Sequence, residues 1–539
     1  MARSPVLVAL IILLAWFARA EATGHGGAER IYRDGILPSG QPLRGVREAG
    51  VSIEGRAAAC ASCHRRSGIG VNEGRIVIPP IVGKYLLRPG ERAMPEAAMR
   101  SPGTAVARRE RYNDSTLARA IREGINSDGK PLSYLMPRFA LSDADSGALV
   151  EYLKSLSSDP VPGVSHDDLH FATIVTPDAD PAERSGMLDV LEHFFSNKND
   201  FERAHDPPLI SARRIHYRVT RKWRLHVWAL SGAPETWEAQ LHARFQTEPV
   251  FAVISGVGGR EWAPVHRFCQ RETLPCLFPN VQLPVVAESD FYPMYFSRGV
   301  LLEADLIRTE LGLSSRATGQ RARVLQVYRR GDIGESAADA LRNQSGTNDA
   351  DWIDLPLAQA RAGGDVRKAL ASVRAGDIVV LWLRSDDLRE LPIEPPKAAV
   401  FASGLMGSLE NAPLPASWRN ATRITYPVDL PQRRAPRLVY PLTWFKTQGI
   451  PVVAERVQVD TYLACQILSE AVGHVFGDLV PDYLIEQIEN MVSFKLLDGF
   501  YPRLGLAPGQ RFASKGGYLV RLAEVNGGPV VAETDWRVP

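Results

Sequence analysis

Two cysteines and a histidine stand close together near the start of the chain, in the stretch AAACASCHRRSGIG. Cys60 and Cys63 are three residues apart, and His64 follows directly. Thiols at this spacing form a redox dithiol, contribute half of a zinc site, or attach a haem covalently. A zinc site needs two further ligands at suitable spacing, and a thioredoxin-like dithiol follows a strand in a βαβ unit. The sequence shows neither context. The spacing therefore predicts a c-type haem held by both thiols, with the His64 imidazole as an axial iron ligand.

A haem that transfers electrons also needs a second axial ligand, and a Met thioether is the usual one at high potential. The candidates are Met94, Met99 and Met136. The first two lie in a charged segment rich in Pro and Gly, which is typical of a surface loop. Met136 precedes Pro137 in a loop before a helix that Ser142 or Asp143 can cap. Because Pro137 disfavours helical geometry at Met136, we expect the sulfur to point inward. The alternative is that Met136 only fills a gap in the core.

Three motifs in this part of the chain resemble those of monohaem class I cytochromes c. CASCHRRSGIG is similar to the haem-binding helix and its exit, and IPPIVG to the proline turn behind the proximal histidine. MPRFALSDADSGALVEYLKSL is similar to the distal methionine loop and the C-terminal helix. The resemblance implies an all-α domain over residues 26–160 with one covalent haem c. It also implies a set of site residues: Cys60 and Cys63 as attachment points, His64 and Met136 as iron ligands, and the backbone carbonyl of Pro79 or Pro80 as the acceptor of the His64 N–H. The insert 88–112 departs from the family pattern, and the sequence assigns it no role.

The first 20 residues predict a secretory signal peptide. Arg3 supplies the positive start, Val6 to Phe17 form an apolar run, and Ala18-Arg19-Ala20 fits the cleavage rule. The alternative is an uncleaved N-terminal anchor, but the apolar run is short for a span of about 20 residues. We therefore expect residues 1–20 to be removed. The mature protein should be soluble in the periplasm, without a membrane span.

Composition excludes several other classes of protein. The chain is 45% hydrophobic and 23% charged, with a formal net charge of +2, which is typical of a globular protein. No basic tract predicts a nucleic-acid partner. Five cysteines in 539 residues are too few for a disulfide-dense scaffold.

The stretch SSDPVPGVSHDD predicts a linker at 161–168 between the first domain and a second one at 169–539. Beyond it, short β runs alternate with amphipathic helical patterns, which favours parallel sheets covered by helices in an α/β fold. About 370 residues are too many for one sheet, so we expect two lobes. The predicted strands are FATIVT (171–176), RLHVWAL (224–230), VFAVIS (250–255), RVLQVY (323–328), DIVVLWL (377–383), AAVFAS (398–403) and RITYPV (423–428).

The order of these elements resembles a type I periplasmic binding protein, the fold of branched-chain amino-acid receptors. The resemblance is carried by PVFAVISGVGGREWAPVHRFCQRETLPCLFPNV, YFSRGVLLEADLIRTEL and VLQVYRRGDIGESAADAL. It implies a small ligand between two lobes, held by backbone N–H groups at a loop before a helix. The matching loop residues are Ser255, Gly256, Gly258, Gly259 and Arg260. The Ser/Thr-rich stretch of the family is missing, so the resemblance does not by itself predict amino-acid binding. The alternative is that these glycines only form a tight turn.

The remaining cysteines predict structure rather than catalysis. In an oxidising compartment, Cys269 and Cys276 are expected to form a disulfide, with two free thiols as the alternative. Cys465 lies on an apolar helix face and should be a buried lone thiol. No catalytic signature stands out in this half of the chain, and we expect no enzyme there.

The sequence as a whole predicts a periplasmic c-type cytochrome for one-electron transfer, fused to a module for partner docking or small-molecule sensing. Arg65 and Arg66 could pair with haem propionates, meet an acidic redox partner, or form a merely solvated face. One alternative is a solute-binding receptor of a transporter or signalling system with an accessory haem. A less favoured one is a haem peroxidase with a labile sixth position.

Overall fold

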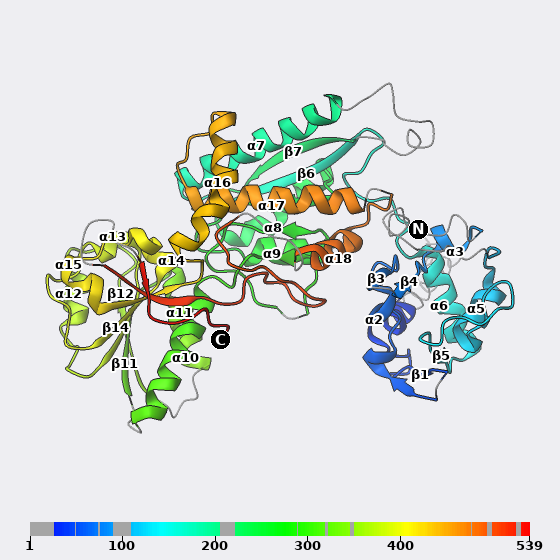
Figure 1. Cartoon of the computed structure of the whole chain (residues 1–539), viewed down its shortest axis with the longest axis horizontal. Coiled ribbons are helices and arrows are strands. Elements are labelled where there is room, and N and C mark those ends of the chain that lie inside the picture. Colours follow the sequence, from blue (N-terminus) through cyan, green and yellow to red (C-terminus); the bar gives the residue numbers. More distant parts are fainter. Residues whose placement is uncertain are drawn as a thin grey trace, which may run out of the picture. The chain divides into compact units, whose positions relative to one another are not determined.

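The computed structural model of the chain (Figure 1) describes residues 26–48, 50–73, 76–89, 109–204, 221–287, 289–318, 322–344, 350–475, 477–492, 499–523 and 530–539. Residues 1–20, predicted as a signal peptide, lie outside these ranges, as do Met94, Met99 and most of the 88–112 insert. The chain divides into two compact units: unit 1 is Met1–Val161 with Val472–Gln487, and unit 2 is Pro162–Ala471 with Ile488–Pro539. Within the described ranges, no helix is both long and apolar enough to cross a membrane.

Short helices surround one apolar core in unit 1. Residues 26–34 are helical, and the further helices are η1 (Gly55–Ala58), α2 (Ala61–His64), α3 (Gly83–Leu86), α5 (Asp114–Glu123) and α6 (Asp143–Ser155). Helix α6 begins where Ser142 Oγ accepts a hydrogen bond of 3.1 Å from the Asp145 N–H. Its buried Leu149, Val150 and Leu153 pack into the core of the unit, as the apolar spacing predicts.

Unit 1 also contains short strands, so the all-α expectation is met only in part. Strands β1 (Arg44–Val46), β2 (Ser52–Glu54) and β5 (Arg138–Phe139) form an antiparallel sheet in the order β2-β1-β5. Strands β3 (Val71–Glu73) and β4 (Ile76–Ile78) pair as a hairpin. These strands are two or three residues long, too short to show the alternating pattern by which a strand is recognised in a sequence.

Residues Val472–Gln487 belong to unit 1, although the sequence analysis placed them in the second domain. They include the end of α17 (Glu455–His474) and the start of α18 (Pro481–Val492). Glu486 accepts hydrogen bonds from the Ser67 N–H at 2.8 Å and the Ser67 hydroxyl at 2.6 Å. Asp478 pairs with Lys84 at 2.6 Å and accepts a hydrogen bond from the Tyr85 hydroxyl. The segment is therefore bonded to the stretch that follows α2 and to α3.

Unit 2 contains two sheets with helices between their strands, which confirms the predicted α/β class. The first sheet is parallel, in the order β10-β9-β8-β6-β7. Its strands are β6 (Asp168–Val175), β7 (Lys222–Ala229), β8 (Ala252–Ile254), β9 (Cys276–Leu277) and β10 (Pro293–Met294), and its helices are α7 (Pro181–Ala204), α8 (Trp237–Thr247) and α9 (Ala263–Arg271).

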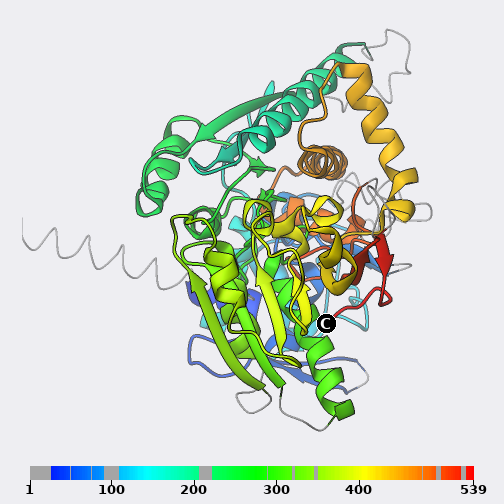
Figure 2. The ribbon, with the colours of Figure 1, turned by 90° about the vertical axis from the view of Figure 1, so that its left-hand side faces the viewer.

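The second sheet has the order β12-β11-β13-β14-β15-β16-β17. Figure 2 shows its central parallel strands in green and yellow, whereas the C-terminal strands are red. The pairs from β12 to β15 are parallel, whereas β16 and β17 are antiparallel. The strands are β11 (Ala322–Arg329), β12 (Ala350–Leu357), β13 (Ile378–Trp382), β14 (Ala399–Ala402), β15 (Thr422–Tyr426), β16 (Tyr518–Leu522) and β17 (Val530–Ala532). The helices are α10 (Val300–Thr318), α11 (Ile333–Gln344), α12 (Asp365–Leu370), α13 (Ser385–Leu388), α14 (Gly404–Gly407), α15 (Ala416–Ala421) and α16 (Pro431–Gln448).

All seven predicted strands are present in these two sheets. Except in the edge strand β7, which is mostly exposed or partly exposed, their apolar runs are largely buried on both faces, as expected for parallel strands. Strands β8 and β13 are almost entirely buried. The sequence did not predict the two-residue strand β10, the partly exposed β12, or the C-terminal pair β16 and β17. Because parallel strands end at the same edge of a sheet, the loops after β6, β8 and β9 meet in unit 2.

Candidate functional site

One helical turn carries the two thiols and the imidazole. Cys60 is the N-terminal flanking residue of α2, and the His64 N–H donates to the Cys60 carbonyl at 2.8 Å. Cys63 therefore lies about one turn after Cys60, and both are free thiols with partly buried side chains. Arg65, at φ 64°, ends the helix directly after His64. Helix α2 and the flanking residue Cys60 thus carry both thiols and the imidazole on about one helical turn.

His64 is held by the proline turn. Its side chain is 6% exposed, and its Nδ1 lies 2.9 Å from the backbone carbonyl oxygen of Pro79. Burial lowers the pKa of His64, against the hydrogen bond to Pro79, so the neutral ring is favoured. With the proton on Nδ1 donated to Pro79, the lone pair of Nε2 is available to a metal. Of the two predicted prolines, Pro79 makes this contact, and Pro80 is a buried neighbour.

Gly70 allows the proline turn to approach His64. It adopts φ 78°, and a Cβ at this position would lie 2.1 Å from the Ile78 carbonyl oxygen and 2.9 Å from that of Pro79. Only glycine tolerates both the left-handed conformation and this close backbone contact. The GIG of the sequence motif is therefore part of the structure that positions the histidine.

Met136 lies in the turn before β5 and packs, partly buried, against the core of unit 1. Its N–H donates to the Ser133 carbonyl at 2.9 Å. Directly after Pro137, Arg138 pairs with Val46 of β1. Met136 is thus fixed at its C-terminal side by a sheet pair, outside any helix.

Five predicted cleft residues lie in the loop after β8 in unit 2. Ser255 is buried, and its Oγ lies 3.0 Å from Thr461 Oγ1 and accepts from Asn280 Nδ2 at 2.9 Å. The Gly256 carbonyl accepts from the Asn280 N–H, and the Gly258 N–H donates to the Asn280 carbonyl. The loop is therefore tied to the end of β9 and to α17.

The last two residues of this loop bind a protein carboxylate. The Arg260 N–H donates to Asp178 Oδ2 at 2.8 Å, and the Gly259 N–H lies 3.4 Å from Asp178 Oδ1 and 3.3 Å from Thr176 Oγ1. Sequence reasoning expected these amides to face a ligand. In this structure Asp178, from the loop after β6, takes that place.

A small cavity lies elsewhere in unit 2. Its volume is about 30 Å³, enough for one or two water molecules. Polar residues of its lining include Asn280, Gln282, Ser297, Arg456, Asp460 and Tyr501. Asp460 lies 3.4 Å from Arg456 Nη1 and accepts from the Tyr501 hydroxyl at 3.2 Å. Of the predicted loop residues, none lines this cavity, so the sequence analysis missed it.

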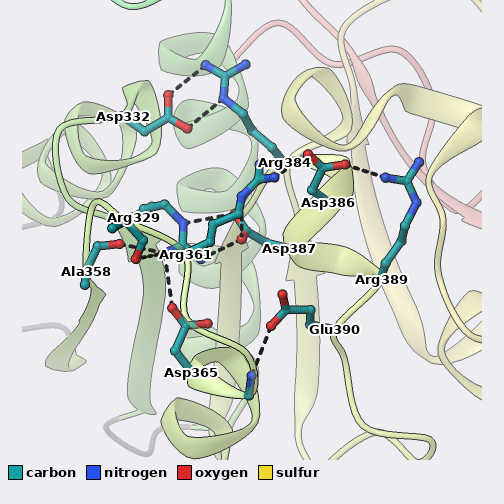
Figure 3. A network of polar contacts seen from close by, with 12 residues as sticks. Arg329, Asp332, Ala358, Arg361, Asp365, Arg384, Asp386, Asp387, Arg389 and Glu390 are labelled. Carbon is teal, nitrogen blue, oxygen red and sulfur yellow. Dashed lines mark hydrogen bonds and ion pairs between the residues drawn. The ribbon is translucent and has the colours of Figure 1, made fainter.

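The second sheet contributes a network of ion pairs at the carboxyl ends of β11 and β13 (Figure 3). Asp332, which follows β11, accepts two hydrogen bonds of 2.7 Å from Arg384. Arg329 donates to Asp387 at 2.6 Å and to Asp365 at 3.1 Å. These contacts hold the loops after β11 and β13 together and neutralise the Arg384 guanidinium.

The expected disulfide between Cys269 and Cys276 is present and joins α9 to β9. Cys465 is a buried free thiol in α17, as the apolar helix face predicted.

Comparison with known proteins decides the nature of unit 1. Residues 55–157 match the family model of cytochrome c. Unit 1 therefore contains a cytochrome c domain. No curated protein gives a significant sequence match to the chain.

Solved structures resemble the remainder of the chain. One is a fatty acid ABC transporter substrate-binding protein from Thermomonospora curvata, at 14% identity and a TM-score of 0.50, covering 71% of this chain and 95% of that chain. Another is a branched-chain amino acid ABC transporter from Thermus thermophilus with bound valine, at 12% identity and a TM-score of 0.50, covering 69% and 97%. At these identities the likeness shows the fold alone, that of type I periplasmic binding proteins.

The cytochrome c domain fits the covalent haem that its family implies. It offers two free thiols that could bond to the haem vinyl groups, and an imidazole and a thioether of the kinds that ligate haem iron. Near the Met136 loop, Arg138 Nη1 and Arg47 Nε are buried without a hydrogen-bond partner. Buried guanidinium nitrogens of this kind suit the carboxylates of haem propionates. Sequence reasoning did not single out Arg138, although a charged residue directly after the Met-Pro turn was a signal for it.

Proposed function

We propose that this protein is an exported c-type cytochrome that transfers single electrons through one haem attached to Cys60 and Cys63. His64 and Met136 are the axial iron ligands in this proposal, and Pro79 orients His64. When bound, the haem supplies reversible one-electron transfer between Fe(II) and Fe(III). The observation that carries the proposal is the 2.9 Å contact between His64 Nδ1 and the Pro79 carbonyl, in a turn that bears both thiols.

The chain's own residues bind and orient the group. The α2 turn fixes the spacing of the thiols, the Pro79 carbonyl holds the His64 proton on Nδ1, and the apolar core excludes water from the iron ligands. We assign electron transfer, not catalysis, to this site, with a periplasmic protein as redox partner. Cleavage of residues 1–20 and delivery to the periplasm belong to the same proposal.

In this proposal unit 2 senses a small molecule or docks the redox partner. Its fold is shared with substrate-binding proteins, one of which was solved with bound valine. This likeness favours sensing over docking. The rival role, a solute receptor with an accessory haem, gains no separate observation.

Replacing Met136 tests the iron ligand. Met136→Ala should lower the reduction potential, because a thioether stabilises Fe(II), and should let the reduced protein bind CO. Optical spectra with and without CO, together with a redox titration, measure both effects. Met99→Ala is the matched control and should change neither. If the reduced wild-type protein already binds CO readily, the Met136 assignment is wrong and a peroxidase-like open site is favoured.

A further inference from the structure

Asp178 occupies a site built for an anion. Its carboxylate accepts from the Arg260 N–H at 2.8 Å and from the Thr176 hydroxyl at 2.6 Å, and the Gly259 N–H lies within 3.4 Å. Two backbone amides and a hydroxyl are the donors that a ligand carboxylate would use at such a loop. Although burial alone would raise it, the hydrogen bonds from Thr176 and the Arg260 amide lower the pKa of Asp178. The side chain is thus held as an anion in place.

Gly259 is matched to this carboxylate. A Cβ at position 259 would lie 2.4 Å from Asp178 Oδ2 and 2.7 Å from the Asp178 carbonyl oxygen. The backbone of Gly259 does not need a positive φ, so the close approach of Asp178 is the structural reason for glycine. The loop and the side chain therefore fit each other.

Arg384, in the loop after β13 of the second sheet, is also neutralised by the protein. It donates two hydrogen bonds of 2.7 Å to Asp332. A ligand carboxylate would have to displace Asp178 from the amides or Asp332 from Arg384. Asp178 is exposed and Asp332 is largely buried, and in each exchange the ligand only replaces hydrogen bonds that the protein already makes. A carboxylate ligand therefore gains little at either place.

The small cavity presents hydrogen-bond acceptors without partners, whereas the donors of the loop after β8 are already occupied. Asp460 is 1% exposed, and its Oδ1 has no hydrogen-bond partner; Gln282 Oε1 is likewise buried without one. Both residues line the cavity. A buried acceptor without a donor costs roughly 1–3 kcal/mol, which a ligand with N–H groups would recover. Phe296 and Tyr501, stacked with ring centroids 5.4 Å apart, also line the cavity, and aromatic rings favour a cation over a neutral hydroxyl.

We propose that the Asp178 carboxylate occupies the amide donors of the loop after β8, where a ligand carboxylate would otherwise bind. Unit 2 therefore selects a small ammonium ligand without a carboxylate, and Asp460 and Gln282 bind this ligand. The inference rests on the proposed function only in that unit 2 binds a small molecule. Asp460 Oδ2 lies 3.4 Å from Arg456 Nη1 and balances its charge, so the N–H groups of the ligand are bound by Asp460 Oδ1 and Gln282 Oε1 and not by a net negative charge. In a cavity of about 30 Å³, only a very small cation fits.

The test uses the full haem-loaded chain and follows the thermal unfolding of unit 2 by tryptophan fluorescence. Methylammonium chloride and sodium acetate are the probes, each compared with sodium chloride at equal ionic strength. Methylammonium should raise the unfolding midpoint of the wild-type protein in a saturable way, and acetate should not. Asp178→Gly should lower the midpoint, and acetate should restore part of the loss by taking the vacated donors.

Two variants separate the parts of the proposal. Asp460→Asn should lose the methylammonium response, because the amide no longer offers a charged acceptor. Asp167→Gly, which removes an exposed carboxylate of the same unit, should gain no response to acetate. Acetate stabilisation of the wild-type protein, or no acetate response in Asp178→Gly, overturns the role of Asp178. A missing methylammonium response, or one that survives Asp460→Asn, overturns the ammonium site.

If Asp178→Gly does not fold, the comparison of acetate with sodium chloride on the wild-type protein still tests the role of Asp178. Haem attachment and the reduction potential are read in unit 1 of the same samples. Intact values there with a failed probe response would reject this inference alone, and a protein without haem would reject the proposed function alone.

Discussion

Glu486 is a buried carboxylate of unit 1 that lies 419 residues after its partner Ser67 in the sequence. Its side chain is 3% exposed, and Ser67 is fully buried. Glu486 accepts both the N–H and the hydroxyl of Ser67, in the stretch that leads from His64 to the proline turn. A buried donor that loses its acceptor keeps its full desolvation cost. The contact therefore contributes to the stability of the segment behind the iron ligand.

We predict that Glu486→Ala destabilises unit 1 by roughly 1–3 kcal/mol, because two buried Ser67 donors lose their acceptor. The stability of Glu486→Gln should lie between that of Glu486→Ala and that of the wild type, since its one carbonyl oxygen still accepts from Ser67. Urea unfolding followed at the haem absorption band reports on this unit. Glu151→Ala, on the exposed face of α6, is the control and should change little. A Glu486→Ala midpoint equal to that of the control would show that the contact contributes nothing.

Residue types with a local spacing rule were predictable from the sequence, and residues brought together by the fold were not. Cys60, Cys63 and His64 are recognisable because covalent haem attachment demands a fixed local spacing. Asp178 was not, because its partners Gly259 and Arg260 are 81 and 82 residues away. Glu486 escaped for the same reason. Nothing in the neighbourhood of either acid distinguishes it from a surface carboxylate.

At the scale of elements, α10 is tied to the ends of two strands by one buried acid. Glu303 is fully buried and accepts from the Ser403 hydroxyl at 2.5 Å, the Leu405 N–H at 3.0 Å and the Thr425 hydroxyl at 2.8 Å. Ser403 and Leu405 follow β14, and Thr425 lies in β15. Burial raises the pKa of Glu303 to about 7, against these hydrogen bonds. The folded state therefore binds the Glu303 proton more tightly than the unfolded state does.

This difference predicts a pH dependence for unit 2. The contribution of Glu303 to stability is fully present below the unfolded pKa of about 4.3 and is lost as pH rises through about 7. Glu303→Gln cannot titrate, so wild-type stability should fall relative to the variant between about pH 5 and about pH 7, by at most roughly 3 kcal/mol. Urea unfolding of both proteins across that range measures the effect. Glu394→Gln, at an exposed position, should track the wild type, and a constant difference for Glu303→Gln would contradict the assignment.

Elements with a strong pattern were found from the sequence and weak ones were not. The apolar runs of β6, β8, β11, β13, β14 and β15 are predictable because parallel strands are buried on both faces. Strands of two residues, such as β5 and β10, are set by backbone pairing in three dimensions and leave no periodic signal. The small sheet of the cytochrome-containing unit was missed for this reason.

At the scale of the whole molecule, the chain returns to its first unit near its end. Residues Val472–Gln487 complete that unit, and the stretches on either side of them belong to unit 2. A domain boundary read along the sequence at 161–168 describes one crossing of the chain between the units but not the later ones. Composition and linker signals mark the first crossing, whereas the later ones fall within α17 and α18, where helical sequence patterns continue without a break.

The most direct test of the central claim is the mass of the protein purified from a periplasm that matures c-type cytochromes, measured under denaturing conditions. The account predicts that the wild-type chain starts after residue 20 and retains one haem. It also predicts that the double variant Cys60→Ser, Cys63→Ser retains none. A wild-type mass without haem, or haem that survives denaturation in the double variant, would contradict the assignment of the Cys60–His64 turn as a covalent haem site.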